Sequence, residues 1–192
     1  MLMTAFAARY ILQVRRRQIT PSLATWLTFT AGVVISFVSY LVASDRDIAA
    51  GVLNTGDICV VLAVSISVGV TRGWVVSLTP FERFYLAAAG AIVLYGVVFS
   101  DAWKSNMFSQ VLITAGYIPL YARMIRERRN TESFSSWSIA LAASLSGMGP
   151  AILQGNALAI LYSSRSAISC AVCLIVMAYF HVTHLREGHA ET

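Results

Sequence analysis

Seven apolar stretches, each separated from the next by a short polar segment, dominate the hydrophobic pattern of the chain. A transmembrane helix needs about 20 consecutive apolar residues, within a range of about 17–25. Six of the stretches have such a length, and the first is shorter. The pattern therefore predicts an all-α integral membrane protein with seven transmembrane helices, at about 2–15, 20–43, 47–70, 80–99, 103–124, 133–154 and 157–181.

Capping residues mark the starts of several of these helices. Thr20 stands before a proline, which places a capping hydroxyl ahead of a first-turn proline. Thr79 also precedes a proline, and Glu82 follows at the spacing of a capping box. Ser133 or Ser135 can cap the sixth helix. These residues predict helix starts close to 20, 80 and 133.

The charges of the connecting segments separate into two groups. Arginines gather after the first, third and fifth helices and in the C-terminal tail, whereas the opposite connections hold few cations among Asp45, Asp47 and Asp101. Basic residues are enriched on the cytoplasmic side, so the N-terminus is predicted outside a plasma (inner) membrane and the C-terminus in the cytoplasm. The arginines of the predicted cytoplasmic side are Arg15, Arg16, Arg17, Arg72, Arg83, Arg123, Arg126, Arg128, Arg129 and Arg186, and the opposite cations are Arg46 and Lys104.

This orientation requires an odd number of helices, so residues 2–15 count as a helix. The alternative is six helices with residues 1–14 lying on the membrane surface, because this stretch is below spanning length. Its arginines follow the apolar run instead of preceding it, which is not the order of a cleavable signal peptide.

Composition excludes several classes of function. Hydrophobic residues make up 57% of the 192 residues and charged residues 12%, against about 25% in soluble domains. In a membrane protein the net charge of +5 bears on the orientation and on the attraction to anionic headgroups. The sequence has no basic patch with interleaved aromatic residues, so nucleic-acid binding is not predicted. Cys170 and Cys173 are spaced C-x-x-C but lack the second half of a zinc site. No catalytic set is visible, so no enzyme, metal or cofactor is predicted.

The two halves of the chain resemble each other. A shift of 111 positions gives six identities in seventeen ungapped positions, which join Tyr10 to Tyr121, Arg15 to Arg126, Arg17 to Arg128, Thr20 to Thr131, Ser22 to Ser133 and Trp26 to Trp137. A single helix between the halves returns the chain to its starting side, so the repeats are parallel and the arrangement is 3+1+3. The predicted units are a first three-helix repeat (1–78), a linker helix (79–100), a second repeat (101–184) and a cytoplasmic tail (185–192).

The second half carries Pro119-Leu120 near the end of its first helix, followed by arginines, Thr131 and Ser133. In this respect the chain resembles the PQ-loop superfamily, which includes the SWEET sugar transporters. The family signature is a Pro-Gln pair at this place, and here leucine replaces the glutamine, while the aligned pair in the first half is Ala8-Arg9. The resemblance implies a 3+1+3 fold and a small-solute carrier, although the superfamily also includes receptors and proteins without a known cargo.

Residues 9–13, which read Arg-Tyr-Ile-Leu-Gln, precede Pro21 and Trp26. This part is also similar to the N-terminal membrane domain of lipid A biosynthesis proteins, which is itself similar to the PQ-loop group. A carrier of the nicotinamide riboside type, with a related arrangement, is a third alternative.

Polar residues interrupt the third and seventh helices at corresponding places. The repeat shift joins Arg165 to Asn54, and Asp57 and Ser164 lie close by. Charges at membrane depth usually face a cavity or pair with each other. We therefore predict a central cavity in which Asn54, Asp57, Ser164 and Arg165 bind substrate, with Arg165 favouring an anionic or zwitterionic solute. The alternatives are a structural Asp57–Arg165 pair and an Arg165 that snorkels to the outer surface.

Prolines and tryptophans supply two further predictions. Pro119 and Pro150 lie within predicted helices, where proline removes a hydrogen bond; each is a hinge or a packing kink. Trp26 and Trp137 open the second and sixth helices, where a tryptophan is an anchor in an aromatic belt or, alternatively, a gate.

Together these patterns predict a facilitator that moves a small polar solute by alternating access. The alternative on the same fold is a non-transporting receptor or interaction protein. In that case the cytoplasmic arginines Arg126, Arg128 and Arg129 bind a partner or anionic lipid. The sequence leaves the substrate and any homo-oligomer open.

Overall fold

The chain folds into a bundle of helices. The computed structural model describes residues 1–43, 48–75 and 77–190, with side chains up to residue 183. Five helices in the described part are long and apolar enough to cross a membrane, namely α2, α3, α4, α7 and residues Ala157–Thr183 of α8. The prediction of an all-helical membrane protein is confirmed in these terms. The helices are α1 (Leu2–Arg15), α2 (Leu23–Ala43), α3 (Val52–Arg72), α4 (Pro80–Phe99), α5 (Ala102–Ala115), α6 (Ile118–Glu127), α7 (Phe134–Leu153) and α8 (Ala157–Ala190).

The fifth predicted helix is divided in two. In place of one helix over 103–124, α5 ends at Ala115 and α6 begins at Ile118. Pro119 stands in the first turn of α6, where it has no N–H to donate to a preceding carbonyl. The chain tightens at the break, because the N–H groups of Gly116 and Tyr117 donate to carbonyls three residues earlier, at 3.1 and 3.2 Å. The prediction of one continuous helix here is therefore wrong.

The predicted caps are confirmed at two helices and wrong at a third. Thr79 Oγ1 accepts from the Glu82 N–H, and Glu82 Oε2 accepts from the Thr79 N–H at 2.8 Å, which makes a capping box at α4. Ser133 Oγ accepts from the Ser136 N–H at 3.2 Å and caps α7. The second helix begins at Leu23, later than predicted, so Thr20 stands outside the helix instead of capping it.

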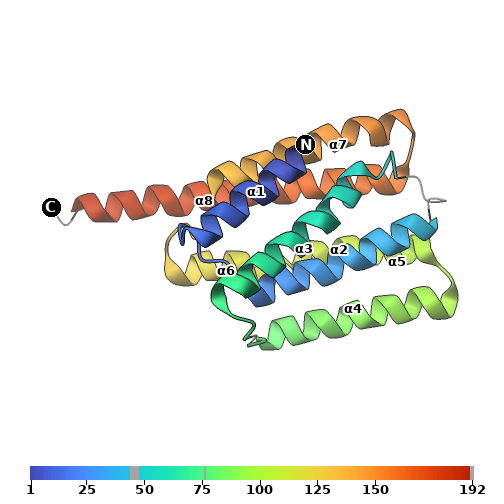
Figure 1. The fold of residues 1–192 in the computed structure, drawn as a ribbon, viewed down its shortest axis with the longest axis horizontal. Coiled ribbons are helices and arrows are strands. Elements are labelled where there is room, and N and C mark those ends of the chain that lie inside the picture. The colour runs from blue at the N-terminus through green and yellow to red at the C-terminus, as the bar shows by residue number, and fades with distance from the viewer. Residues whose placement is uncertain (44–47, 76, 191–192) are drawn as a thin grey trace.

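The helices form two groups that meet along the middle of the bundle (Figure 1). In one group α3 contacts both α1 and α2, and in the other α8 contacts α7, α5 and α6. The groups are joined by contacts of α1 with α7, of α2 with α5, and of α3 with both α7 and α8. The remaining helix, α4, packs against α2 and α5 and lies at the outside of the bundle (Figure 1).

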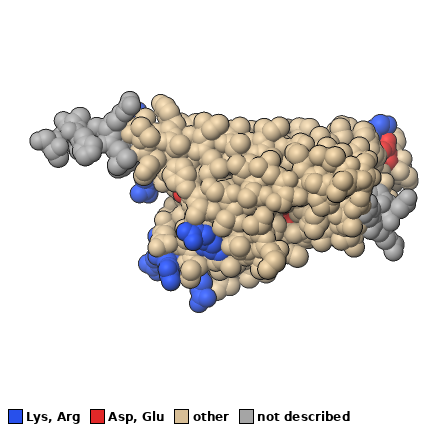
Figure 2. Space-filling view, turned by 90° about the horizontal axis from the view of Figure 1, so that it is seen from above, with Lys and Arg blue, Asp and Glu red and all other residues tan. Residues whose placement is uncertain are grey.

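The exposed charged side chains of the described residues lie mainly at the ends of the bundle. Figure 2 shows arginine and lysine side chains gathered at one end, and an almost uncharged surface along the middle. We call this the basic end; it holds the ends of α1, α3 and α6 and the start of α4. At the opposite, distal end Lys104 pairs with Asp101 at 2.8 Å. Asp45, Arg46, Asp47 and the side chain of Arg186, which contribute to the orientation argument, lie outside the described residues, and the orientation stays a prediction.

Close packing of α2 against α4 and α5 depends on one glycine. A Cβ added at Gly32 would lie 2.6 Å from the Tyr85 hydroxyl oxygen and 2.9 Å from Ile113 Cγ1. Gly90 on α4 faces open space, because no heavy atom lies within 4 Å of its added Cβ. The two glycines therefore separate the effect of packing from the effect of helix propensity.

Gly32→Ala is expected to destabilise the protein, because overpacking a close contact typically costs about 1–3 kcal/mol. Gly90→Ala is expected to be neutral or stabilising, by up to about 1 kcal/mol, because alanine favours helix. The measurement is the unfolding midpoint of each purified variant in detergent. Equal midpoints for the two variants would show that α2 does not pack as closely as described.

Candidate functional site

A small cavity of about 60 Å³ lies where the two groups of helices meet. Aromatic rings, two charged side chains and two serines form its wall. All of the lining residues belong to helices or to the α5–α6 break. The side chains that line it are Met3, Phe6, Trp26, Phe29, Val33, Asp57, Val60, Val61, Ile113, Tyr117, Trp137, Ala140, Ser144, Arg165, Ser166 and Cys170. The cavity is therefore the place where charged groups of α3 and α8 face a shared space.

Asp57 and Arg165 face this cavity without pairing. Both belong to the described residues, yet no ion pair joins them. Asp57 Oδ2 instead accepts a hydrogen bond from the Tyr162 hydroxyl, and Arg165 Nε donates to Gln110 Oε1 at 2.9 Å. The Arg165 guanidinium also lies over the Tyr162 ring, 4.8 Å from its centroid. The predicted alternative of a direct Asp57–Arg165 pair is therefore wrong, because both side chains bind neutral neighbours instead of each other.

Arg165 keeps a buried nitrogen without a partner. Its Nη1 is buried and has no hydrogen-bond partner in the protein. A buried unsatisfied donor is costly unless a ligand or water accepts from it. The alternative of an Arg165 that snorkels to the outer surface is also wrong, since the side chain lines the cavity. Arg165 can thus present a guanidinium N–H to an anionic group inside the bundle.

A layer of buried amides and hydroxyls continues from Arg165 toward the distal end. Gln110 Nε2 donates to Ser36 Oγ at 2.9 Å and to Asn106 Oδ1 at 3.2 Å. Asn106 Nδ2 donates to the Ser36 carbonyl at 2.7 Å. Asn54 Nδ2 reaches Ser36 Oγ at 3.5 Å, while Asn54 Oδ1 has no partner. The layer links α2, α3, α5 and α8 by polar contacts within an apolar bundle.

The four predicted substrate-binding residues occupy different places. Asp57 and Arg165 line the cavity, whereas Asn54 lies in the polar layer beside it. Ser164 is half-buried and does not line the cavity; Ser166 does, with its Oγ 2.8 Å from that of Ser144. Of the predicted residues, Asp57 and Arg165 therefore line one cavity. The serine of α8 that lines it is Ser166 and not the predicted Ser164.

The two predicted interface tryptophans are buried. Trp26 is 6% and Trp137 4% exposed, and both line the cavity. Each indole N–H has an internal acceptor: that of Trp26 donates to the Tyr10 hydroxyl at 3.2 Å, and that of Trp137 to Glu132 Oε2 at 3.4 Å. Anchors of an aromatic belt face lipid, so the anchor interpretation does not fit this burial.

Glu132 is the centre of a polar network at the basic end. Its side chain is 1% exposed and forms an ion pair with Arg123, which is 12% exposed. Glu132 Oε2 also accepts from the Tyr10 hydroxyl at 2.9 Å, and Arg123 Nη1 donates to the Thr20 carbonyl at 2.6 Å. This Glu132 network joins α1, the segment before α2, α6 and α7 between the cavity and the basic end.

Burial raises the pKa of Glu132 above its ordinary value, and the charge of Arg123 opposes that rise. The raised pKa means that the folded protein holds this proton to a higher pH than the unfolded chain does. The connection between α6 and α7 therefore carries a carboxyl group whose protonation is linked to the fold.

A contact between an amide and a phenol joins helices near the distal end. Asn156, in the turn between α7 and α8, donates from Nδ2 to the Tyr40 hydroxyl at 3.1 Å. A Cβ added at Gly51 would lie 2.4 Å from Tyr40 Cε1, so the start of α3 approaches the same ring closely. Pro150 lies inside α7 near this end, and Pro119 lies at the α5–α6 break on the other side of the cavity. The two predicted hinge prolines thus stand on opposite sides of the cavity.

Sequence reasoning missed Glu132, Gln110 and Asn106. Glu132 follows a run of arginines and resembles an ordinary connecting-segment charge, while single amides within an apolar stretch do not stand out. In the part of the chain that is described, no three His, Cys, Asp or Glu side chains gather as metal ligands. Compared with models of protein families, with curated proteins and with solved structures, the chain matches none. Membership of the PQ-loop superfamily stays a prediction.

The raised pKa of Glu132 predicts how stability depends on pH. A carboxyl whose pKa is higher in the folded state contributes stability below its unfolded pKa, about 4.3 for glutamate, and loses that contribution as the pH rises through its folded-state value. As the pH rises from the unfolded pKa to the folded-state pKa of Glu132, wild type is therefore expected to lose stability relative to Glu132→Gln, because glutamine does not titrate. The measurement is the apparent unfolding temperature of both proteins in detergent across that pH range. Parallel profiles would contradict the assignment.

Proposed function

We propose that the protein is a carrier in which a small anionic or zwitterionic solute binds between Asp57 and Arg165 and crosses the membrane by alternating access. The observation that carries this proposal is a cavity that holds two unpaired, opposite charges inside an apolar bundle. Ionisable groups at membrane depth are costly and usually belong to a substrate or ion pathway. A purely structural pair would be expected to neutralise itself by direct contact.

The chemistry of the wall favours a solute with a carboxylate or phosphate. Arg165 offers the free Nη1 N–H, and guanidinium groups bind such anions through charge-assisted hydrogen bonds. Across the cavity, Asp57 and the rings of Phe6, Phe29 and Trp26 are suited to an ammonium group, by charge and by cation–π attraction. A zwitterion satisfies both sides, which is why we favour it.

The lining of the cavity supports the 3+1+3 arrangement of two parallel repeats. Four pairs of residues that correspond under the shift of 111 positions line it together: Phe6 with Tyr117, Trp26 with Trp137, Phe29 with Ala140, and Val33 with Ser144. Under the repeat, α1 corresponds to the divided helix of α5 and α6, and α2 corresponds to α7. The contact of α1 with α7 therefore matches the contact of α5 with α2, which agrees with a two-fold axis through the cavity. Carriers built from such repeats bind their substrates at the interface between them.

Two sets of contacts at the ends of the bundle are suited to serve as gates. The Glu132 network lies on the basic side of the cavity, and the contact of Tyr40 with Asn156 lies on the distal side. Alternating access requires that each set breaks while the other is kept. The α5–α6 break and Pro150 provide places where the second half can bend. In this proposal Trp26 and Trp137 act as gate residues, and the basic end faces the cytoplasm.

The first experiment is a thermal-shift screen of the purified protein against amino acids, organic acids, sugars and nucleosides. A ligand stabilises the folded state by mass action, so a specific solute raises the unfolding temperature. The screen is repeated with Arg165→Ala and with Arg129→Ala, a surface control that removes the same charge. A solute that stabilises wild type and the control, but not Arg165→Ala, identifies the substrate class.

Arg165→Ala is expected to lower uptake of that solute into proteoliposomes by about tenfold or more, because a charge-assisted hydrogen bond contributes about 1.5–3 kcal/mol. Arg165→Lys keeps the charge but not the fork of donors and is expected to recover part of the uptake. The folded fraction of each variant is measured by size-exclusion chromatography. Undiminished uptake by folded Arg165→Ala would remove this residue from the site.

A receptor or interaction protein remains the second candidate, and the exposed arginines of the basic end favour it. Replacing Arg126, Arg128 and Arg129 together by glutamine is expected to change solute uptake by less than about twofold if the protein is a carrier, since surface charges contribute little. Function that is lost in this variant and kept in Arg165→Ala would support the second candidate. The comparison is made in the same proteoliposomes.

A further inference from the structure

A second pocket, distinct from the central cavity, lies at the basic end between α2, α4 and α6. Its volume is about 260 Å³, and we call it the interfacial pocket. It is lined by Ser22, Thr25, Thr79, Phe81, Glu82, Ile118, Pro119, Ala122, Arg123 and Arg126. Two arginines and several hydroxyl groups thus surround a space that opens beside the first turn of α4.

The position of α4 places this pocket at the level of lipid headgroups. Helix α4 packs against α2 and α5, and its outer face is apolar, with Phe84 and Val97 each 72% exposed. Its 20 residues span about 30 Å, which is the thickness of the hydrocarbon core. Because α4 crosses the apolar layer from end to end, its first turn at Pro80 lies at the boundary between acyl chains and headgroups.

The charges of the pocket favour an anion. Arg126 is exposed at the pocket, and Arg123 keeps a buried Nε without a partner while its other nitrogens bind Glu132 and the Thr20 carbonyl. The carboxylate of Glu82 also lines the space, but its Oε2 is occupied by the N–H and the hydroxyl of Thr79. The pocket therefore presents the exposed guanidinium of Arg126 and the unpartnered Nε of Arg123, whose charge is already paired with Glu132.

We infer that the interfacial pocket binds the phosphate headgroup of an anionic phospholipid, with Arg126 and Arg123 as the cationic contacts. The apolar outer face of α4 lies directly beside the pocket and is suited to the acyl chains of the same lipid. Among the three arginines that the sequence offers to anionic lipid, only Arg126 lines this pocket; Arg128 and Arg129 do not. The pocket shares Arg123 and Pro119 with the proposed basic gate and hinge, but lipid binding at it does not require that the protein transports a solute.

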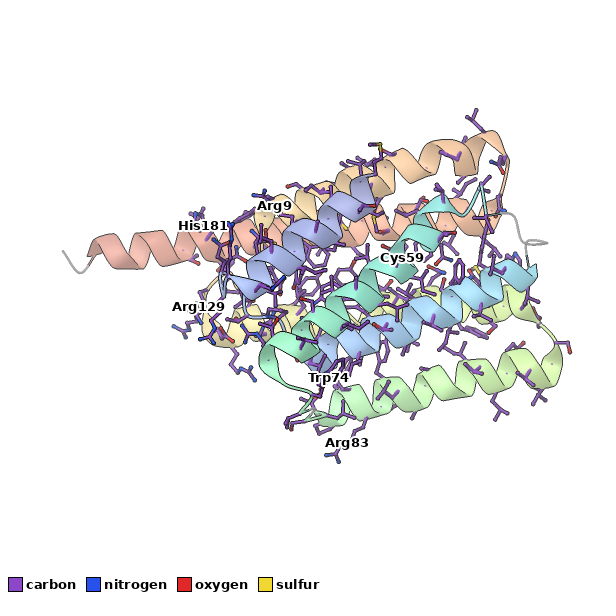
Figure 3. All side chains as sticks on the ribbon, viewed as in Figure 1. Arg9, Cys59, Trp74, Arg83, Arg129 and His181 are labelled. Carbon is purple, nitrogen blue, oxygen red and sulfur yellow. The ribbon has the colours of Figure 1, made fainter. Side chains whose placement is uncertain are left out.

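Two variants test the pocket, and a third is the matched control. Arg126→Gln removes a pocket charge, and Ala122→Leu fills the pocket without changing any charge. Arg83→Gln removes an equal charge from the first turns of α4 at the same end, where the side chain points away from the bundle and does not line the pocket (Figure 3). All three positions are exposed, so the variants are expected to fold.

The experiment compares nanodiscs of phosphatidylcholine alone with nanodiscs that also contain phosphatidylglycerol, and counts retained lipid by native mass spectrometry after extraction. Wild type and Arg83→Gln are expected to retain phosphatidylglycerol in preference to phosphatidylcholine. Arg126→Gln is expected to weaken that retention about tenfold, because a hydrogen bond to a charged group is among the strong ones. Ala122→Leu is expected to weaken it as well.

Three results would overturn the inference. Equal loss in Arg83→Gln and Arg126→Gln would indicate diffuse attraction to the membrane surface. Unchanged retention in Ala122→Leu would place the lipid outside the pocket. Inorganic phosphate that stabilises the protein in phosphatidylcholine as strongly as phosphatidylglycerol does, and that loses its effect in Arg126→Gln, would show that the site takes a free anion instead of a lipid.

Discussion

The buried carboxylate of Glu132 is the interaction on which the basic end depends. A charge that is removed from water is costly unless it is paired and hydrogen-bonded, and here Arg123, Tyr10 and Trp137 supply those partners. Tyr10 is 122 positions away in sequence, so the carboxylate fixes α1 against the start of α7. Loss of one partner of such a pair typically costs about 3–5 kcal/mol. A single acid thus determines how the two halves of the chain meet at this end.

The two ends of the bundle are held by different chemistry, and this difference has a functional consequence. The basic end is joined by an ion pair, a tyrosine hydroxyl and the Trp137 indole N–H around one carboxylate, whereas the contacts of the distal end include a hydrogen bond between an amide and a phenol. The first set contains a carboxyl group whose protonation is linked to the fold. In the proposed carrier, protonation of Glu132 would change the energy of the state in which the basic end is closed. Proton coupling would then enter at the basic gate.

The sequence predicted the parts of the structure that depend on periodicity and on the repeat. The stretches for α2, α3, α4, α7 and α8 were located correctly because long apolar runs have few alternatives in a membrane. The shift of 111 positions brought Arg165 into correspondence with α3, and Arg165 and Asp57 of α3 both line the cavity. The break between α5 and α6 was missed, because a proline in a membrane helix can bend the chain without ending the helix.

The predictions that failed or were missed concern the partners of side chains. Tryptophans at the ends of membrane helices usually face the interface, whereas here Trp26 and Trp137 are internal and both contact aromatic rings of α1. Glu132 corresponds to Pro21 in the first half, so the repeat gave no indication of a carboxylate there. Its burial follows from three helices that converge on it, which is a tertiary property that no local pattern contains.

The separation of Asp57 and Arg165 has a physical explanation in their neighbours. A bare pair in an apolar cavity would attract strongly, because the local dielectric is low. Here Tyr162 stabilises both charges through different groups: its hydroxyl donates a hydrogen bond to Asp57, and its ring faces the Arg165 guanidinium. Gln110 holds Arg165 from the other side through Nε. Neutral groups therefore compensate both charges, and the two charges do not form an ion pair. In the proposed carrier, a solute with both charges would supply the missing direct contact, and it would lower the cost of burying Asp57 and Arg165 only while it is bound.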